Sequence, residues 1–117
     1  MRASQARHDL WTDVQRFLAR FDLLITPTVA VPPFEVGRPG VKEIAGREVG
    51  PLGWIPFTYP FNLTGQPAAT VPVGFTASGL PVGLQIVGRR HGDRTVLAAS
   101  AAFEAAAPWA DSKPRLD

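Results

Sequence analysis

Two alternating runs joined by a short turn constrain the fold of this 117-residue chain more than any other feature. Apolar side chains occupy every second position of both runs, at Val71, Val73 and Phe75 and again at Val82, Leu84 and Ile86. This period of two is typical of β-strands that bury one face. Between the runs, Ser78-Gly79 accommodates a positive φ, and Pro81 directs the chain out of the turn. The pattern predicts a β-hairpin with strands over about 69–76 and 82–88.

The first quarter of the chain combines a helix with a short strand. Apolar residues recur at helical spacing between Ser4 and Phe21, at Leu10, Trp11, Val14, Phe17, Leu18 and Phe21. This stripe predicts a helix over 4–21 that packs on a core. Leu23–Thr26 follow as an apolar run without alternation and stop at Pro27. Such a run indicates a strand over 23–26 that is buried on both faces, in the middle of a mostly parallel sheet. The rest of the chain offers little to surround such a strand, so we expect part of a larger sheet.

A long loop and an aromatic segment separate this strand from the hairpin. Residues 27–53 contain five prolines and five glycines and show no sustained period, so we expect a loop. Residues 54–62 are aromatic, and Pro56 and Pro60 allow only a short helical turn. After the hairpin, an alanine-rich stretch predicts a helix over 93–107, capped by Asp93 and ended by Pro108. We expect its apolar stripe to comprise Val96, Ala99, Phe103 and Ala106, and residues 108–117 to be frayed.

Composition excludes several functional classes. The chain has no cysteine, which rules out disulfides, thiolate metal sites and a cysteine nucleophile, and its two histidines are isolated. We therefore expect no metal and no cofactor. Twelve basic and ten acidic residues give a net charge of only +2, with no basic-aromatic motif, so we expect no nucleic-acid partner. No apolar run is long enough to cross a bilayer, so we expect no membrane partner either. Charged residues interrupt the first twenty positions, unlike a signal peptide, so we expect a cytoplasmic protein.

Fixed glycines, prolines and amides across the hairpin region resemble a known family. The spacing Asn62-x-x-Gly65-x-Pro67-Ala68 is followed by Val71-Pro72-x-Gly74 and by Gly79-Leu80-Pro81-x-Gly83-Leu84-Gln85-x-x-Gly88. Together with Asp22–Thr28, this spacing is similar to the C-terminal portion of the amidase signature family of serine amidohydrolases. The resemblance implies an α/β fold in which residues 1–117 form the C-terminal part of an amidase domain, a fragment of a mixed β-sheet layered with helices.

The chemistry of that family has no counterpart in these residues. The resemblance implies a serine nucleophile and a second serine in a cis peptide, both within a Gly-Ser-Ser motif, and a proton-shuttling lysine upstream of that motif. None of the serines lies in such a motif: Ser4, Ser78, Ser100 and Ser112. The lysines are Lys42, in the long loop, and Lys113, in the tail. We therefore assign no catalytic residue to the chain and expect it to be inactive alone.

The aromatic segment is the candidate substrate site. The resemblance implies that the stretch before Asn62 lines the acyl pocket, which makes the candidate substrate-binding residues Trp54, Ile55, Phe57, Thr58 and Phe61. Core packing is the alternative for these side chains. The long loop at 27–53 either lies near the substrate entrance, as the resemblance implies, or is a disordered surface loop. For Asn62 and Gln85 we favour structural roles, in which a buried amide tethers a loop to backbone groups.

Three functional hypotheses follow. The first is the C-terminal portion of an amidase that hydrolyses a neutral amide, with the missing N-terminal part of the domain as its partner. The second is the tail of a protein similar to the amidase-type component of glutamyl/aspartyl-tRNA amidotransferase; that component has an acidic residue before its Asn-x-x-Gly motif, whereas no acid lies between Glu48 and Asp93 here. The third is a non-catalytic binding or structural remnant. We also expect the isolated chain either to expose an apolar patch that includes the aromatics at 54–61 and to self-associate, or to need the rest of the enzyme to stay folded.

Overall fold

A three-stranded antiparallel sheet forms the centre of the molecule, with helices on both of its faces. The structure is a computed structural model, and it describes residues 2–112. Its elements are α1 (Arg2–Arg20), β1 (Leu23–Pro27), β2 (Glu43–Ile44), β3 (Arg47–Glu48), α2 (Tyr59–Thr64), β4 (Ala68–Phe75), β5 (Pro81–Gly88) and α3 (Asp93–Ala106). The expected α/β class, with a β-hairpin and a C-terminal helix, is confirmed. Each hairpin strand begins one residue earlier than expected.

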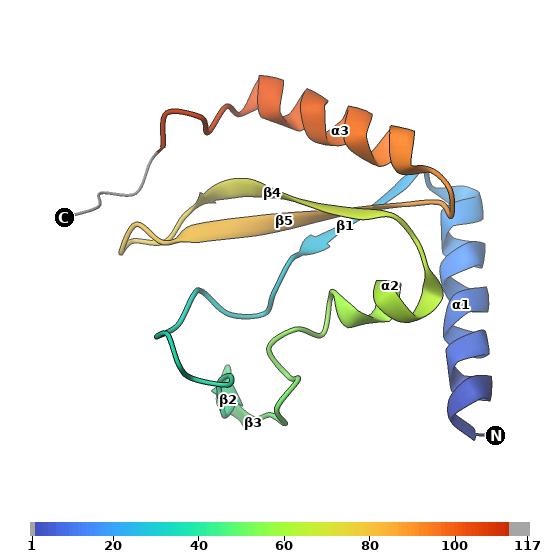
Figure 1. Cartoon of the computed structure of the whole chain (residues 1–117), viewed down its shortest axis with the longest axis horizontal. Coiled ribbons are helices and arrows are strands. Elements are labelled where there is room, and N and C mark those ends of the chain that lie inside the picture. The colour runs from blue at the N-terminus through green and yellow to red at the C-terminus, as the bar shows by residue number, and fades with distance from the viewer. Residues whose placement is uncertain (1, 113–117) are drawn as a thin grey trace.

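The strand order is β1-β5-β4, so the second strand of the hairpin lies in the middle (Figure 1). β4 and β5 pair from Ala68↔Val87 onward, with a bulge between Pro72 and Gly74. Their turn is closed by the Thr76 N–H, which donates to the Leu80 carbonyl at 2.8 Å, and Gly79 has the expected positive φ of 82°. The alternation therefore correctly predicts the hairpin and its turn.

The helix α3 lies along one face of β4 and β5 and forms the core with them. Its Val96 is buried against Val71 and Ile86. The expected contributions of Ala99 and Phe103 are present, whereas Ala106 is exposed. Trp109 packs on this core instead, with its ring 6.3 Å from that of Phe103, so Trp109 is not frayed as expected, whereas residues 110–112 are exposed. Residues 113–117, including Lys113, lie outside the described residues.

The start of α3 differs from expectation in its capping residue. Gly92, with φ −90°, is the N-cap, and no side chain caps the helix there. Asp93 instead occupies the first turn, where a carboxylate is favourable beside the positive end of the helix dipole.

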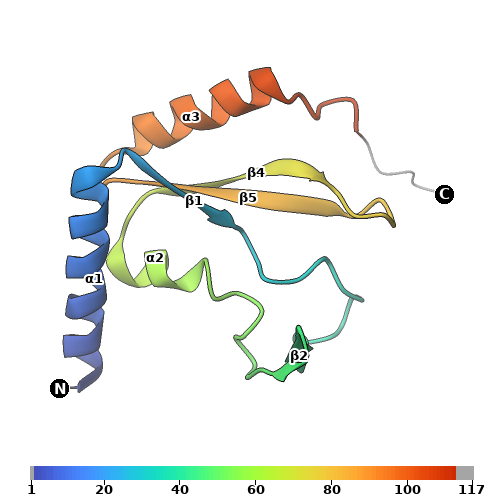
Figure 2. The same ribbon diagram turned by 180° about the vertical axis from the view of Figure 1, so that it is seen from behind.

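The opposite face of the sheet is covered by the shorter helix α2, with α1 at the end of the sheet (Figure 2). α1 packs against α2 and fully buries Leu18. Arg89, just after β5, holds the end of α1: its Nε donates to the Leu18 carbonyl at 2.7 Å, and its Nη2 lies 3.1 Å from Asp22. Val87 and Gln85 are consequently buried on this face, so β5 is covered on both sides.

The strand predicted over 23–26 is present, but within this chain it lies at the edge of the described sheet; its central position in a larger, mostly parallel sheet stays a prediction. β1 pairs only with β5, and the pairing is antiparallel, from Leu23↔Gly88 to Pro27↔Leu84. Among the described strands β1 is an edge, and Ile25 is 50% exposed. The physical reason is that β5 occupies the one position with neighbours on both sides.

The long connection after β1 contains a second, two-stranded sheet that its sequence did not indicate. β2 and β3 pair as a hairpin around Ala45-Gly46, with φ values of 50° and 77°. Two left-handed residues are typical of a tight type I′ turn, but alanine seldom occupies the first of them, so the usual Asn-Gly signal is missing. Across residues 2–112, no helix combines the length and apolar character needed to cross a membrane.

Candidate functional site

An apolar cavity of about 600 Å³ lies between the loop after β1, the aromatic segment and the start of β5. Its lining is Pro27, Val29, Ala30, Val31, Pro32, Pro33, Phe34, Trp54, Phe57, Pro81, Val82 and Gly83. No charged side chain lines it, and its volume is within the usual range for small-molecule sites. The cavity is therefore suited to a neutral, apolar group.

Two aromatic rings and one backbone hydrogen bond build the outer wall. Phe34 meets Trp54 edge-to-face, with ring centroids 5.2 Å apart and an interplanar angle of 86°. This is one of the favourable geometries for an aromatic pair. The Ala30 N–H donates to the Trp54 carbonyl at 3.0 Å, which joins the loop to the aromatic segment. Part of the loop at 27–53 is thus an ordered wall of the cavity.

The side chain of Gln85 anchors this wall to the sheet. Its Nε2 donates to the Phe57 carbonyl at 2.7 Å and to the Thr26 hydroxyl at 3.0 Å. Both amide hydrogens are used, and the residue is only 3% exposed. The predicted structural role of Gln85 is confirmed. Asn62 is exposed on α2, and its expected structural role stays a prediction.

The floor of the cavity is backbone at Gly83. A Cβ there would lie 2.7 Å from Thr28 Oγ1 and 2.9 Å from Thr70 Cγ2, closer than real Cβ atoms approach their neighbours. The Thr28 hydroxyl donates to that of Thr70 at 3.3 Å, so these side chains, from opposite sides of β5, meet beside Gly83. Glycine is needed here for this close approach.

Of the five predicted substrate-binding residues, the structure places two in the lining of the cavity. Trp54 and Phe57 line the cavity, whereas Ile55, Thr58 and Phe61 do not. Thr58 donates to the Ile55 carbonyl, and Phe61 is 8% exposed. Substrate contact by all five residues, including the two that line the cavity, stays a prediction about a complete domain. The expected aromatic patch is also smaller than predicted, because in 54–61 only Tyr59 is an exposed large hydrophobic residue.

Most of the cavity lining was missed from sequence. The wall at 29–34 and the strand start at 81–83 have no motif that links them to residues 54–57. The only signal was the run of apolar residues and prolines after Pro27, which fits a loop wall as well as an exposed turn.

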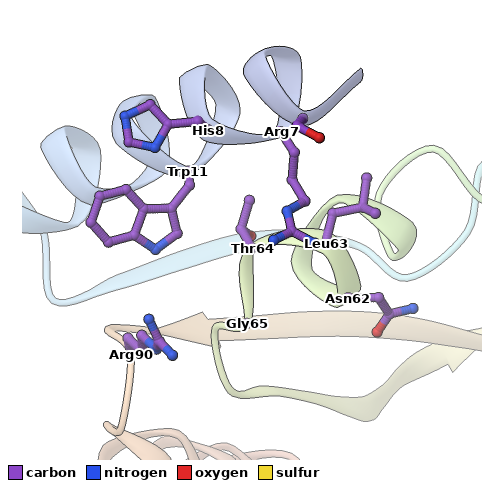
Figure 3. Close-up of a pocket in the computed structure, with 9 residues that line it drawn as sticks. Arg7, His8, Trp11, Asn62, Leu63, Thr64, Gly65 and Arg90 are labelled. Atoms are coloured by element: carbon purple, nitrogen blue, oxygen red, sulfur yellow. The ribbon is translucent and has the colours of Figure 1, made fainter. Parts of the chain in front are cut away.

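A second cavity, of about 480 Å³, lies between α1, α2 and the chain after β5. Figure 3 shows Arg7, His8 and Trp11 on α1, Asn62 and Leu63 on α2, and Arg90 beyond β5. None of its lining residues is acidic. This cavity is polar and cationic, unlike the first.

The hydroxyls of two serines, Ser78 and Ser100, are engaged with groups other than lysine. Ser78 shares a hydrogen bond of 2.9 Å with Thr76, and Ser100 donates to the Val96 carbonyl at 2.8 Å, as helix serines often do. Ser4 lines the second cavity, and Lys42 is exposed before β2. Within residues 2–112, no group of three or more histidine, aspartate or glutamate side chains is placed to hold a metal ion.

Comparisons with known proteins agree on one family. A family model described as Amidase matches residues 1–97. The acylamidase of Rhodococcus erythropolis is 45% identical over 115 residues, which are 97% of this chain and 24% of the relative. A component of the glutamyl-tRNA(Gln) amidotransferase of Pseudothermotoga lettingae is 45% identical over 108 residues, 92% of this chain and 22% of the relative.

Solved structures give the same result in three dimensions. A bacterial aryl acylamidase of the amidase signature family superposes with a TM-score of 0.84 at 38% identity, covering 93% of this chain and 24% of that one. A 6-aminohexanoate cyclic dimer hydrolase superposes with a TM-score of 0.75 at 35% identity, over 88% and 23%. The chain spans about a quarter of the length of these relatives. It belongs to the amidase signature family, as a C-terminal fragment of a larger amidase domain.

Proposed function

We propose that this chain is the C-terminal quarter of an amidase that hydrolyses the C–N bond of a carboxylic amide, with its Ser-cisSer-Lys residues outside the chain. Ser78 and Ser100 make hydrogen bonds to Thr76 and Val96, which supports the absence of a nucleophile–base pair here. The chain would supply a wall of the substrate pocket, and the missing N-terminal part of the domain would supply the reacting groups.

The observation that carries the substrate class is the uncharged lining of the 600 Å³ cavity. A zwitterionic or charged acyl group would lose hydration there without gaining a counter-ion, which is unfavourable. A neutral aryl or alkyl group would instead bury apolar surface against Trp54, Phe57 and Phe34. We therefore favour small neutral amides as substrates of the complete enzyme.

A chimera tests this proposal. The matching quarter of the Rhodococcus erythropolis acylamidase is replaced by this chain, and hydrolysis of a neutral anilide is measured. Trp54→Ala and Phe57→Ala should each lower kcat/KM by about tenfold or more, because each removes a large apolar contact. Tyr59→Ala is the matched control, since Tyr59 is exposed and lies outside the cavity lining. Equal losses in all three variants would contradict the assignment of the pocket.

The second candidate is a protein similar to the amidase-type component of glutamyl-tRNA amidotransferase. The 45% identity to the Pseudothermotoga lettingae protein favours it. The uncharged cavity argues against it, because a glutamine substrate carries an ammonium and a carboxylate group. Glutamine hydrolysis by the chimera, in preference to anilide hydrolysis, would favour this candidate over a general amidase.

A non-catalytic binding or structural remnant is the third candidate. A chimera that is folded but hydrolyses neither anilide nor glutamine would favour it. We further propose that the protein is cytoplasmic and that the isolated chain self-associates. Cell fractionation and sedimentation of the purified chain test these two points.

A further inference from the structure

We propose that Gly40, held in place by the β2–β3 hairpin, positions the indole ring of Trp54 and thereby limits the size of the acyl group that the apolar cavity accepts. Gly40 is in this view a positioning residue, because it acts on a bound group only through Trp54. The statement about acyl size rests on the proposed function, whereas the contact between Gly40 and Trp54 does not depend on it.

Gly40 lies directly against the indole ring. A Cβ at Gly40 would be 3.0 Å from both Cδ1 and Nε1 of Trp54, and 3.4 Å from the Pro51 carbonyl oxygen. Real Cβ atoms seldom have neighbours at 3.0 Å, so an added methyl group would force the indole to move by a few tenths of an ångström. Gly40 is absent from the lining of the 600 Å³ cavity, so it supports Trp54 from outside that cavity.

The other contacts of Trp54 decide where its ring would go. Its backbone is held by the Ala30 N–H, which donates to the Trp54 carbonyl at 3.0 Å. Its ring already meets that of Phe34 edge-to-face, with centroids 5.2 Å apart. Phe34 and Trp54 are both walls of the cavity. An indole displaced from Gly40 therefore moves toward Phe34 or into the cavity, and either movement narrows the space for an acyl group.

The β2–β3 hairpin fixes the chain on both sides of this contact. The Val49 N–H donates to the Lys42 carbonyl at 2.9 Å, which extends the pairing of the hairpin toward Gly40. Val49 also packs on Gly53, where a Cβ would overlap the Val49 side chain, and Gly53 directly precedes Trp54. The hairpin lies apart from the three-stranded sheet (Figure 1), and these contacts give it a role in shaping the cavity.

A matched pair of glycines tests the contact without using turnover. Gly40 and Gly74 have the same φ of 156°, but a Cβ at Gly74 would meet nothing within 4 Å. Alanine at either position brings similar backbone strain, and only Gly40→Ala crowds Trp54. In the NMR spectrum of the 117-residue chain, the indole N–H signal of Trp54, identified by its loss in Trp54→Ala, should shift in Gly40→Ala and stay in place in Gly74→Ala. An unchanged signal in Gly40→Ala, or equal shifts in both variants, would overturn the proposal.

The acylamidase chimera tests the consequence for acyl size, by comparing kcat/KM for benzanilide with kcat/KM for acetanilide. Gly40→Ala should lower this ratio by about threefold to tenfold, less than a full methylene group is worth in an apolar pocket. Gly74→Ala should leave the ratio unchanged. In a Trp54→Ala background Gly40→Ala should not change it either, because the indole is gone.

The two proposals fail in different ways. An active chimera in which Gly40→Ala leaves the ratio unchanged would overturn this inference and leave the proposed function intact. A chimera that hydrolyses neither anilide would contradict the proposed function, and the indole signal of the chain would still decide whether Gly40 positions Trp54.

Discussion

Two isoleucines that face each other across neighbouring strands differ sharply in burial. Ile25 of β1 pairs directly with Ile86 of β5, yet Ile25 is 50% exposed and Ile86 is 2% exposed. Residue type and secondary structure are the same at both positions. The difference comes from strand order, because β5 has neighbours on both sides and lies beneath α3, whereas β1 has one neighbour.

The largest expected effect tests this contrast directly. Ile86→Ala should lower the free energy of unfolding of the chain by about 2–5 kcal/mol, because it opens a cavity against Val71 and Val96. Ile25→Ala should cost about 1 kcal/mol or less, since half of that side chain is already in water. Urea unfolding followed by circular dichroism measures both values. Similar losses for both variants would mean that β1 is covered in solution, for example by another copy of the chain.

A glycine at the end of β5 sharpens the comparison at the level of packing. A Cβ on Gly88 would lie 2.6 Å from Val96 Cγ2, so Gly88→Ala should cost about 1–3 kcal/mol through overpacking. The double variant with Val96→Ala should lose less stability than the sum of the two single losses, because the smaller side chain makes room for the new methyl group. Strict additivity of the two losses would contradict this account.

The buried side-chain amide of Gln85 links β5 to β1 and to the aromatic segment. Gln85→Leu should cost about 1–2 kcal/mol, because the Phe57 carbonyl and the Thr26 hydroxyl lose their donor. Trp54 fluorescence should also shift, since the wall that contains Trp54 is anchored through Phe57. Gln5→Ala, which removes an exposed hydrogen bond to Asp9, is the control and should change neither quantity measurably.

The smallest expected effect concerns the ion pair where β1 begins and β5 ends. Asp22→Asn should change stability by less than about 0.5 kcal/mol, because the Asp22–Arg89 pair is exposed and screened by salt. Arg89→Leu should cost more, since it also removes the donor to the Leu18 carbonyl at the end of α1. Equal effects of the two substitutions, measured by thermal melts at low and high salt, would assign the stabilisation to the ion pair.

Local sequence patterns predicted the helices and strands better than they predicted which strands lie side by side. Alternation located the hairpin, and a helical stripe located α1, because both patterns depend on residues close in the chain. Strand order depends on contacts between distant segments, so the apolar run Leu23–Ile25 could not show that β5 takes the middle position among the described strands. Trp54 and Phe57 were named because the family resemblance points to the aromatic segment before Asn62, and both line the cavity. The remaining walls, at 29–34 and 81–83, approach that segment only through the fold.

Gly83 has a consequence for how this protein could diversify. Since its backbone forms the floor of the cavity, a bound group would rest there on peptide atoms that are the same for every amino acid, and no side chain can be added without displacing Thr28 and Thr70. Variation is confined to the walls, which are loop residues that tolerate exchange more readily than a central strand does. The apolar groups that the cavity accepts should therefore change through substitutions at wall positions such as Phe34 and Trp54, while Gly83 stays the same.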